Sequence, residues 1–136
     1  MAANVLADTS FVVALINRRD AHHAWAATQS ANHPPPWATC EAALAEAFHL
    51  LGAQGARGLR TLLQRAALRP AFDLGDQLEP VLQLMQKYAD VPIGLADACL
   101  VRMTEILADP LLLTTDSDFR VYRRHSRQMV PCVFPD

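Results

Sequence analysis

Several patterns that mark common protein classes are missing from this sequence. Its three cysteines, Cys40, Cys99 and Cys132, show no paired spacing, which argues against a disulfide framework and against a thiolate zinc site. No apolar run approaches the roughly 18 residues that span a bilayer, and no basic segment followed by an apolar stretch and a cleavage site opens the chain. We therefore expect reduced thiols and a cytoplasmic protein.

Lysine is also scarce, and the common phosphate-binding loops are absent. Lys87 is the one lysine among 12 basic residues, the formal net charge is -2, and neither a Gly-Lys-Ser/Thr loop nor a Gly-x-Gly-x-x-Gly motif occurs. Nucleic-acid binding would therefore depend on local groups of arginines rather than on overall charge. Two such groups are Arg57, Arg60, Arg65 and Arg69, and Arg120, Arg123, Arg124 and Arg127. A solvated charged surface is the alternative interpretation of both groups.

The 136 residues, 51% of them hydrophobic, predict one compact domain over residues 1–136. Short apolar segments alternate with segments of helical periodicity. The expected strands are 4–7, 37–39, 71–74, 111–114 and 129–134, and the expected helices are 9–17, 21–30, 41–51, 54–68, 76–88, 95–107 and 116–124. Such alternation predicts an α/β fold with a central parallel sheet that is covered on both faces.

Four carboxylates interrupt segments that should form the core. Asp8 directly follows the apolar strand candidate Val5-Leu6-Ala7, and Asp116 ends the run 111–115. Glu46 and Asp97 lie in apolar helices, about five and three residues from their expected starts. The carboxyl ends of parallel strands share one edge of a sheet, where helix starts also converge, so the four acids can face one another there.

Convergence of these acids would require a cation or protonation, because two carboxylates about 5 Å apart repel by roughly 3 kcal/mol at an effective dielectric near 20. Oxygen ligands favour Mg²⁺ or Mn²⁺ over zinc. Such ions activate water for attack on phosphorus, which predicts a metal-dependent nuclease. Helix capping is the alternative role for Asp8 and Asp116. The helical neighbours of Glu46 predict a largely apolar face around it, and His22-His23 is interpreted as a solvated loop or helix surface.

Four segments resemble the PIN-domain ribonucleases, especially the VapC-type toxins of toxin–antitoxin modules. They are Val5-Leu-Ala-Asp-Thr-Ser10, Leu44-Ala-Glu-Ala47, Leu95-Ala-Asp-Ala98 and Leu113-Thr-Thr-Asp-Ser-Asp-Phe119. The resemblance implies a three-layer α/β/α sandwich and a Mg²⁺- or Mn²⁺-dependent endoribonuclease that leaves a 5′-phosphate and a 3′-hydroxyl. The residues that match the four catalytic acids of the family are Asp8, Glu46, Asp97 and Asp116.

The same resemblance implies further roles and partners. Asp8, Asp97 and Asp116 would hold the metal, and Asp118 resembles an additional acid of some members. Ser10 and Thr115 would form hydrogen bonds near the site. RNA, including tRNA, would be the substrate, and a cognate antitoxin and a second copy of the chain would be partners. The arginines that would contact RNA are Arg120, Arg123, Arg124 and Arg127. A PIN nuclease of RNA processing and a catalytically idle PIN-fold binding module are the two alternatives.

Overall fold

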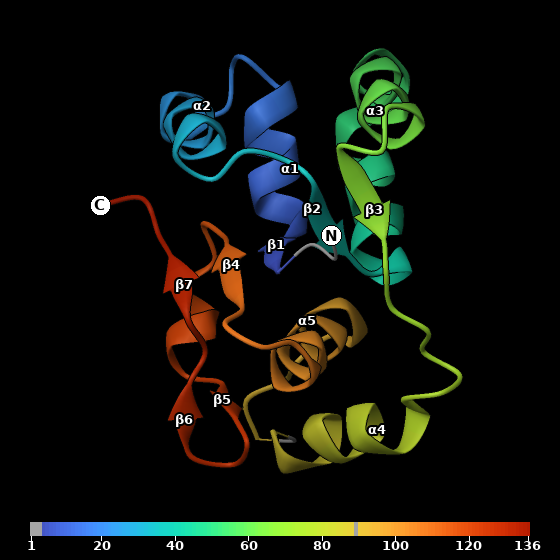
Figure 1. Cartoon of the computed structure of the whole chain (residues 1–136), viewed down its shortest axis with the longest axis vertical. Coiled ribbons are helices and arrows are strands. Elements are labelled where there is room, and N and C mark those ends of the chain that lie inside the picture. Colours follow the sequence, from blue (N-terminus) through green and yellow to red (C-terminus); the bar gives the residue numbers. More distant parts are fainter. Residues whose placement is uncertain (1–3, 89) are drawn as a thin grey trace.

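The computed structural model describes residues 4–88 and 90–136, so residues 1–3 and 89 of the expected domain lie outside it. Five parallel strands form one sheet in the order β3-β2-β1-β4-β7. These strands are β1 (Val5–Ala7), β2 (Trp37–Thr39), β3 (Leu68–Pro70), β4 (Leu111–Leu113) and β7 (Cys132–Val133). Helices α1 (Thr9–Ile16), α2 (His23–Asn32) and α3 (Glu41–Gln64) lie on one side of the sheet, and α4 (Leu78–Lys87) and α5 (Leu95–Ile106) lie on the other (Figure 1). This arrangement confirms the expected α/β/α sandwich.

The strands are apolar on both faces because each face packs on a layer of helices. Successive strand side chains point to opposite faces. Leu6 of β1 accordingly joins the core under α4 and α5, while its neighbour Ala7 joins the core under α1, α2 and α3. In the second core the Phe11 ring meets Trp25 and Trp37 edge-on, with centroids 6.0 and 5.3 Å away. The two cores hold the central strands in a fixed register.

Helix α3 joins two segments that were expected as separate helices. Gly52 has non-helical dihedral angles (φ 67°, ψ -170°), which glycine adopts without the strain of a Cβ atom. The expected break at Gly52 is therefore present as a kink, and the helix continues beyond it to Gln64. The kink lets one long helix follow α1 along most of its length.

Three segments differ from the sequence-based prediction. The single strand expected over 129–134 is wrong, because β6 (Gln128–Met129) and β7 are separate short strands in two different sheets. The strand expected at 71–74 is wrong: β3 starts at Leu68, which is 1% exposed and aligns with Trp37 of β2. The helix expected over 116–124 is also wrong in its second half. Only Ser117–Arg120 forms a 3-10 helix (η1), and β5 (Arg123–Arg124) then pairs with β6 (Gln128–Met129) in an antiparallel hairpin. The positive φ angles of the hairpin turn cannot be read from the charge pattern of this segment.

All three cysteines are free thiols, and Cys40 and Cys99 are buried. Among the described residues, no helix combines the length and the apolar character that crossing a membrane requires.

Candidate active site

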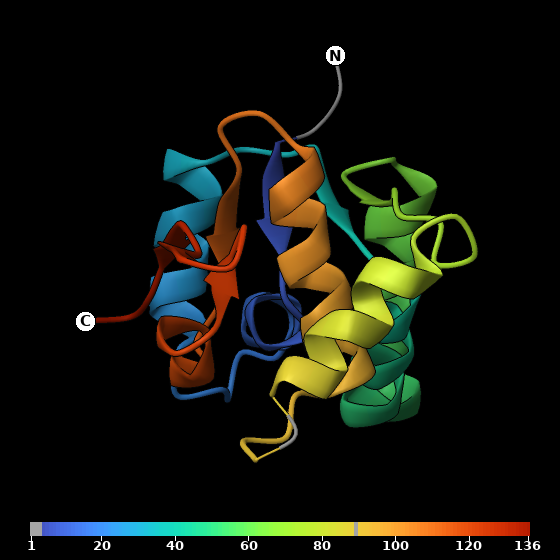
Figure 2. The same ribbon diagram turned by 90° about the horizontal axis from the view of Figure 1, so that it is seen from below.

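The four predicted acids line one cavity at the carboxyl edge of the sheet. Asp8 follows β1, Asp116 follows β4, Glu46 lies in the second turn of α3, and Asp97 lies in the first turn of α5. Figure 2 shows α1 end-on just beyond the carboxyl end of β1, which is the edge where these elements meet. The cavity that all four side chains line has a volume of about 320 Å³. The fold thus brings together acids that are as many as 108 residues apart in the sequence.

Asp8 is the most buried of the four acids, with 4% of its surface exposed. Its Oδ1 accepts a hydrogen bond from the Thr9 N–H at 2.8 Å, so it caps α1. Its Oδ2 accepts from the hydroxyls of Ser10 at 3.0 Å and Thr114 at 2.7 Å. Burial raises the pKa of Asp8, and these hydrogen bonds oppose that effect. Capping and cavity lining, weighed as alternatives for this residue, therefore occur together.

A network of hydroxyl groups connects the ends of β1 and β4. The fully buried Thr114 Oγ1 donates to Asp8 and accepts from the Asp116 N–H at 2.9 Å. Ser10 Oγ accepts from the backbone N–H of Thr115 at 3.0 Å. Ser10 thus forms the kind of hydrogen bond that the resemblance implies, and Thr115 contributes its backbone. Sequence reasoning missed Thr114, although its place between a strand and Asp116 was the available signal.

Asp97 is partly buried on α5, and the Tyr122 hydroxyl donates to its Oδ2 at 3.4 Å. Burial, followed by repulsion from the neighbouring carboxylates of Asp8 and Asp116, raises the pKa of Asp97 to about 7. The site is therefore a concentration of negative charge that the protein alone does not neutralise. A positive ligand would relieve the repulsion directly.

Glu46 is placed differently from what its apolar neighbours indicated. It is exposed at the rim of the cavity, and Leu50, one turn later, is 65% exposed. The helix packs through Ala43 and Ala47, which are 2% and 1% exposed. The face around Glu46 is thus divided, because Ala43 packs on the core while Glu46 and Leu50 face solvent.

Asp20 and His22 also line the cavity, and sequence reasoning did not single them out. The His22 N–H donates to Asp20 Oδ1 at 2.8 Å within the connection between α1 and α2. His22 is exposed, as expected, whereas the Nδ1 atom of His23 lies 2.8 Å from the carbonyl oxygen of Ala14. Only the path of this connection brings His22 to the cavity, so no local pattern could predict its position.

The remaining predicted residues lie outside the lining of the cavity. Asp118 is exposed, and its N–H donates to Asp116 Oδ1 at 2.9 Å. The guanidinium of Arg123 donates to three backbone carbonyls that include Arg120 O, and that of Arg124 donates to Thr104 O. Arg120 lies over the Phe134 ring at 4.1 Å, and Arg127 is exposed in the hairpin. Much of this basic group is therefore engaged within the protein.

The chemistry of the donor set fits a hard divalent cation, which takes carboxylate oxygens as ligands. Within residues 4–88 and 90–136, no three His, Cys, Asp or Glu side chains form a group that could hold one ion directly. Mg²⁺ commonly keeps several water ligands and is held through one or two carboxylates. The four acids that line the cavity offer carboxylate oxygens to such a hydrated ion.

The stability of the metal-free protein is expected to fall as the pH rises through the range in which Asp97 ionises. Its pKa is 3.8 in ordinary surroundings and about 7 in the folded protein. The folded state therefore binds more protons between these values, and the free energy of unfolding decreases with increasing pH. Melting temperatures of wild type and Asp97→Asn in EDTA, measured from pH 5 to pH 8, check this. The advantage of the variant should grow with pH, and a constant difference would contradict the expected electrostatic cause.

Comparisons with known proteins agree with this architecture. The family model of the PIN domain matches residues 5–124. The crystal structure of VapC20 of Mycobacterium tuberculosis, a toxin that cleaves the sarcin-ricin loop, superimposes with a TM-score of 0.77 at 23% sequence identity. The match covers 86% of this chain and 93% of VapC20, and it shows a common fold. No curated protein matches the chain significantly. Because the family model spans most of the sequence, including all four acids of the cavity, the chain belongs to the PIN domain family.

Proposed function

We propose that the protein is a metal-dependent endoribonuclease that acts as the toxin of a toxin–antitoxin pair. The observation that carries this proposal is the cavity in which Asp8, Glu46, Asp97 and Asp116 meet at the carboxyl edge of a PIN fold. Ligands of open α/β sheets bind at this edge. The fold shared with a toxin that cleaves the sarcin-ricin loop supports the same activity.

Asp8, Asp97 and Asp116 would hold Mg²⁺ or Mn²⁺, because they are the acids that lie on strand ends and on the first turn of α5. A bound ion of this kind neutralises charge on the scissile phosphate and lowers the pKa of a water molecule. The hydroxyls of Ser10 and Thr114 orient the Asp8 carboxylate toward the cavity. Tyr122, which belongs to the core under α4 and α5, restrains Asp97 in the same way through its hydroxyl.

Glu46 is the acid best placed to orient and deprotonate the attacking water, since it is exposed at the rim where substrate enters. The water oxygen forms a bond to phosphorus while the bond from phosphorus to the 3′-oxygen breaks. One proton passes from water to the carboxylate, and the 3′-oxygen takes up a proton from solvent. The products are a 5′-phosphate and a 3′-hydroxyl.

The proposed partners follow from the same assignment. Single-stranded regions of RNA, such as those of tRNA or of a ribosomal RNA loop, are the substrates, and a cognate antitoxin binds the toxin in the cytoplasm. A homodimer is the proposed assembly. Asp118 lies beside Asp116 and is proposed as an additional acid, and Arg120 and Arg127 are the exposed members of the basic group that are proposed to contact RNA near the hairpin.

Two alternatives make different predictions for the same protein. A PIN nuclease of RNA processing would cleave RNA but would not inhibit growth when it is expressed without a partner. A catalytically idle binding module would tolerate Asp97→Asn with no loss of function. The number of carboxylates in one cavity favours the enzyme, because a binding module has no need to concentrate charge at a cost in stability.

The proposal predicts cleavage of RNA that depends on a divalent cation. Purified protein is expected to cleave labelled total tRNA, or a ribosomal RNA hairpin that contains the sarcin-ricin loop, with Mg²⁺ or Mn²⁺ and not with EDTA. Mapping of the product ends should find a 5′-phosphate and a 3′-hydroxyl. Equal cleavage with EDTA would reveal a contaminating nuclease of another type, and intact RNA under all conditions would favour the binding module.

A further inference from the structure

A second hollow adjoins the acidic cavity along the groove between α1 and α3. Its volume is about 440 Å³, and its lining includes Asn17, Arg18, Gln54 and Arg57. Leu50 lines both this hollow and the acidic cavity, so the two adjoin at its side chain. The groove therefore connects a cluster of carboxylates with a pair of arginines.

Close packing of α1 and α3 determines where the groove runs. At the start of both helices, the Thr9 hydroxyl donates to the Ala43 carbonyl at 2.8 Å. Toward their ends, a Cβ atom on Gly58 would lie only 3.1 Å from Ile16 Cγ2, so the absence of a side chain on Gly58 permits the approach. The two helices rise side by side in Figure 1. Helix α1 has eight residues and a length of about 12 Å, and it separates Asp8 at its start from Arg18 beyond its end.

The two arginines of the hollow differ from others in this chain. Both are exposed, and among the described residues neither guanidinium forms an ion pair or a hydrogen bond. Arg102, by contrast, pairs with Glu105 at 3.1 Å. A guanidinium presents donors that match the oxygens of a phosphate group in two-point contacts. Arg18 and Arg57 can therefore direct their donors to a ligand outside the protein.

Leu50 offers an apolar contact between the acidic cavity and the hollow. Its side chain is 65% exposed, the highest value among the large apolar residues that the structure describes. The sugar and base of a nucleotide offer apolar surface between successive phosphates, so Leu50 can pack against that part of a strand. A simple anion would gain nothing from this contact and would be repelled by the adjacent carboxylates.

We propose that the hollow lined by Arg18 and Arg57 binds a backbone phosphate of single-stranded RNA, a few nucleotides from the bond held at the acidic cavity. This subsite rests on the proposed ribonuclease function and deepens it. The positive charge of this subsite comes from its two arginines and not from the whole chain, whose net charge is -2. The subsite adds the groove between α1 and α3 to the path of the substrate, on the other side of the acidic cavity's shared residue Leu50.

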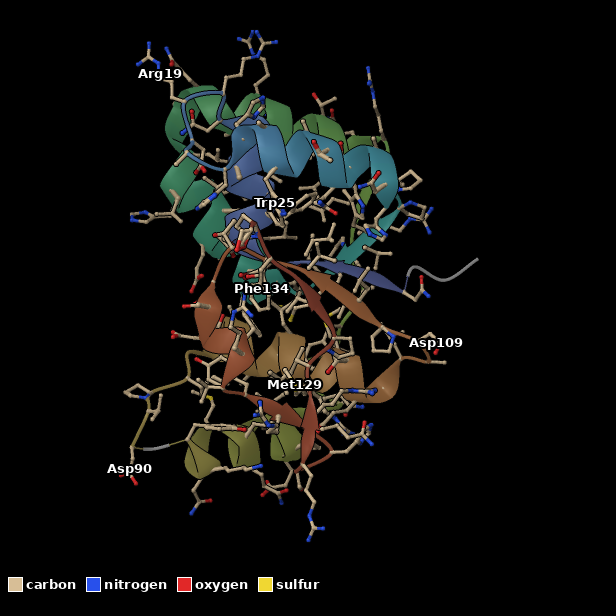
Figure 3. All side chains as sticks on the ribbon, turned by 90° about the vertical axis from the view of Figure 1, so that its left-hand side faces the viewer. Arg19, Trp25, Asp90, Asp109, Met129 and Phe134 are labelled. Atoms are coloured by element: carbon tan, nitrogen blue, oxygen red, sulfur yellow. The ribbon has the colours of Figure 1, made fainter. Side chains whose placement is uncertain are left out.

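The test compares two double variants that remove the same charge. Arg18→Ala/Arg57→Ala removes the subsite, and Arg19→Ala/Arg60→Ala is the matched control from the same connection and the same helix. Both control residues are exposed and lie outside the lining of the hollow, and Arg19 projects away from the body of the protein (Figure 3). Binding of a fluorescein-labelled single-stranded RNA is followed by anisotropy in Mg²⁺, with Asp116→Asn in every protein to suppress cleavage.

The subsite variant is expected to weaken RNA binding by about tenfold or more. The slope of log affinity against log salt concentration should decrease in magnitude by roughly 0.7 for each lost phosphate contact. The control should change affinity by less than about threefold, which is the effect of general charge alone. Equal loss in both variants, or no loss in either, would overturn the subsite.

Cleavage kinetics separate failure of the subsite from failure of the proposed function. In proteins with intact acids, the subsite variant should raise KM about tenfold and change kcat by less than threefold, since the contact is made equally in the ground and transition states. Cleavage with an unchanged KM would overturn the subsite and retain the nuclease. A wild type that neither binds nor cleaves RNA would overturn both.

Discussion

Asp97→Asn is expected to lower kcat/KM for RNA cleavage by about 10³-fold or more, which corresponds to about 4 kcal/mol of transition-state stabilisation. The reason is that Asp97 contributes carboxylate oxygen to the cavity from the first turn of α5, opposite Asp8 and Asp116. An amide has the same shape but lacks the negative charge that holds a divalent cation. Single-turnover cleavage of a labelled RNA in Mg²⁺ measures the effect.

The same variant is expected to be more stable than wild type when no cation is present. The pKa of Asp97 in the folded protein, about 7, means that ionisation of this side chain opposes folding at neutral pH. Because the residue is only partly buried, solvent screens much of this effect, and a gain of about 1–2 kcal/mol is reasonable. The melting temperature in EDTA at pH 8 should rise by about 3–8 °C. Loss of activity with a gain in stability is typical of a functional acid and not of a structural one.

Asp109→Asn provides the matched control. Asp109 is an exposed acid that precedes β4, at the opposite end of the strand from Asp116, and Figure 3 shows it far from the connection that carries Arg19. Its φ of 48° is well tolerated by asparagine. This variant should keep both the activity and the melting temperature of wild type. If Asp97→Asn and Asp109→Asn behaved alike, the cavity would not be catalytic toward that RNA.

Thr114→Val should lower activity by about 10²-fold and stability by about 2–3 kcal/mol. The side chain keeps its shape but loses the hydroxyl that donates to Asp8 Oδ2 at 2.7 Å and accepts from the Asp116 N–H at 2.9 Å. The loss leaves the partly buried N–H of Asp116 without a partner and the buried Asp8 carboxylate with one donor fewer. Both acids would then be free to shift, and displacements of about 1 Å at a reacting centre commonly cost about 10²-fold in rate.

Thr114 is a positioning residue, so its test includes a measurement that a purely structural role would not alter. The Mg²⁺ concentration for half-maximal cleavage should rise about 10-fold or more in Thr114→Val, and Thr114→Ser should restore it. Thr104→Val is the control, because Thr104 is also fully buried and its hydroxyl donates only to the Val101 carbonyl of its own helix. An unchanged Mg²⁺ requirement in Thr114→Val would limit this residue to a structural role.

Much of the fold was predictable because its signals are local. Asp8 follows a run of apolar residues and caps a helix, and both properties arise from neighbours within a few positions. The strand at 37–39 and the helix that carries Asp97 were predicted for the same reason. The strand expected at 71–74 was misplaced because its true start depends on pairing with β2, which lies about 30 residues earlier in the sequence.

The sequence by itself determined which acids stand at strand ends and helix starts, because apolar periodicity and capping depend on adjacent residues. Only the tertiary structure decided what surrounds those acids. His22 lines the cavity, Thr114 connects Asp8 with Asp116, and Arg18 lies near Arg57, since helices and strands distant in the sequence pack against one another. Side-chain volumes across the two cores determine that packing, and no single segment contains this information.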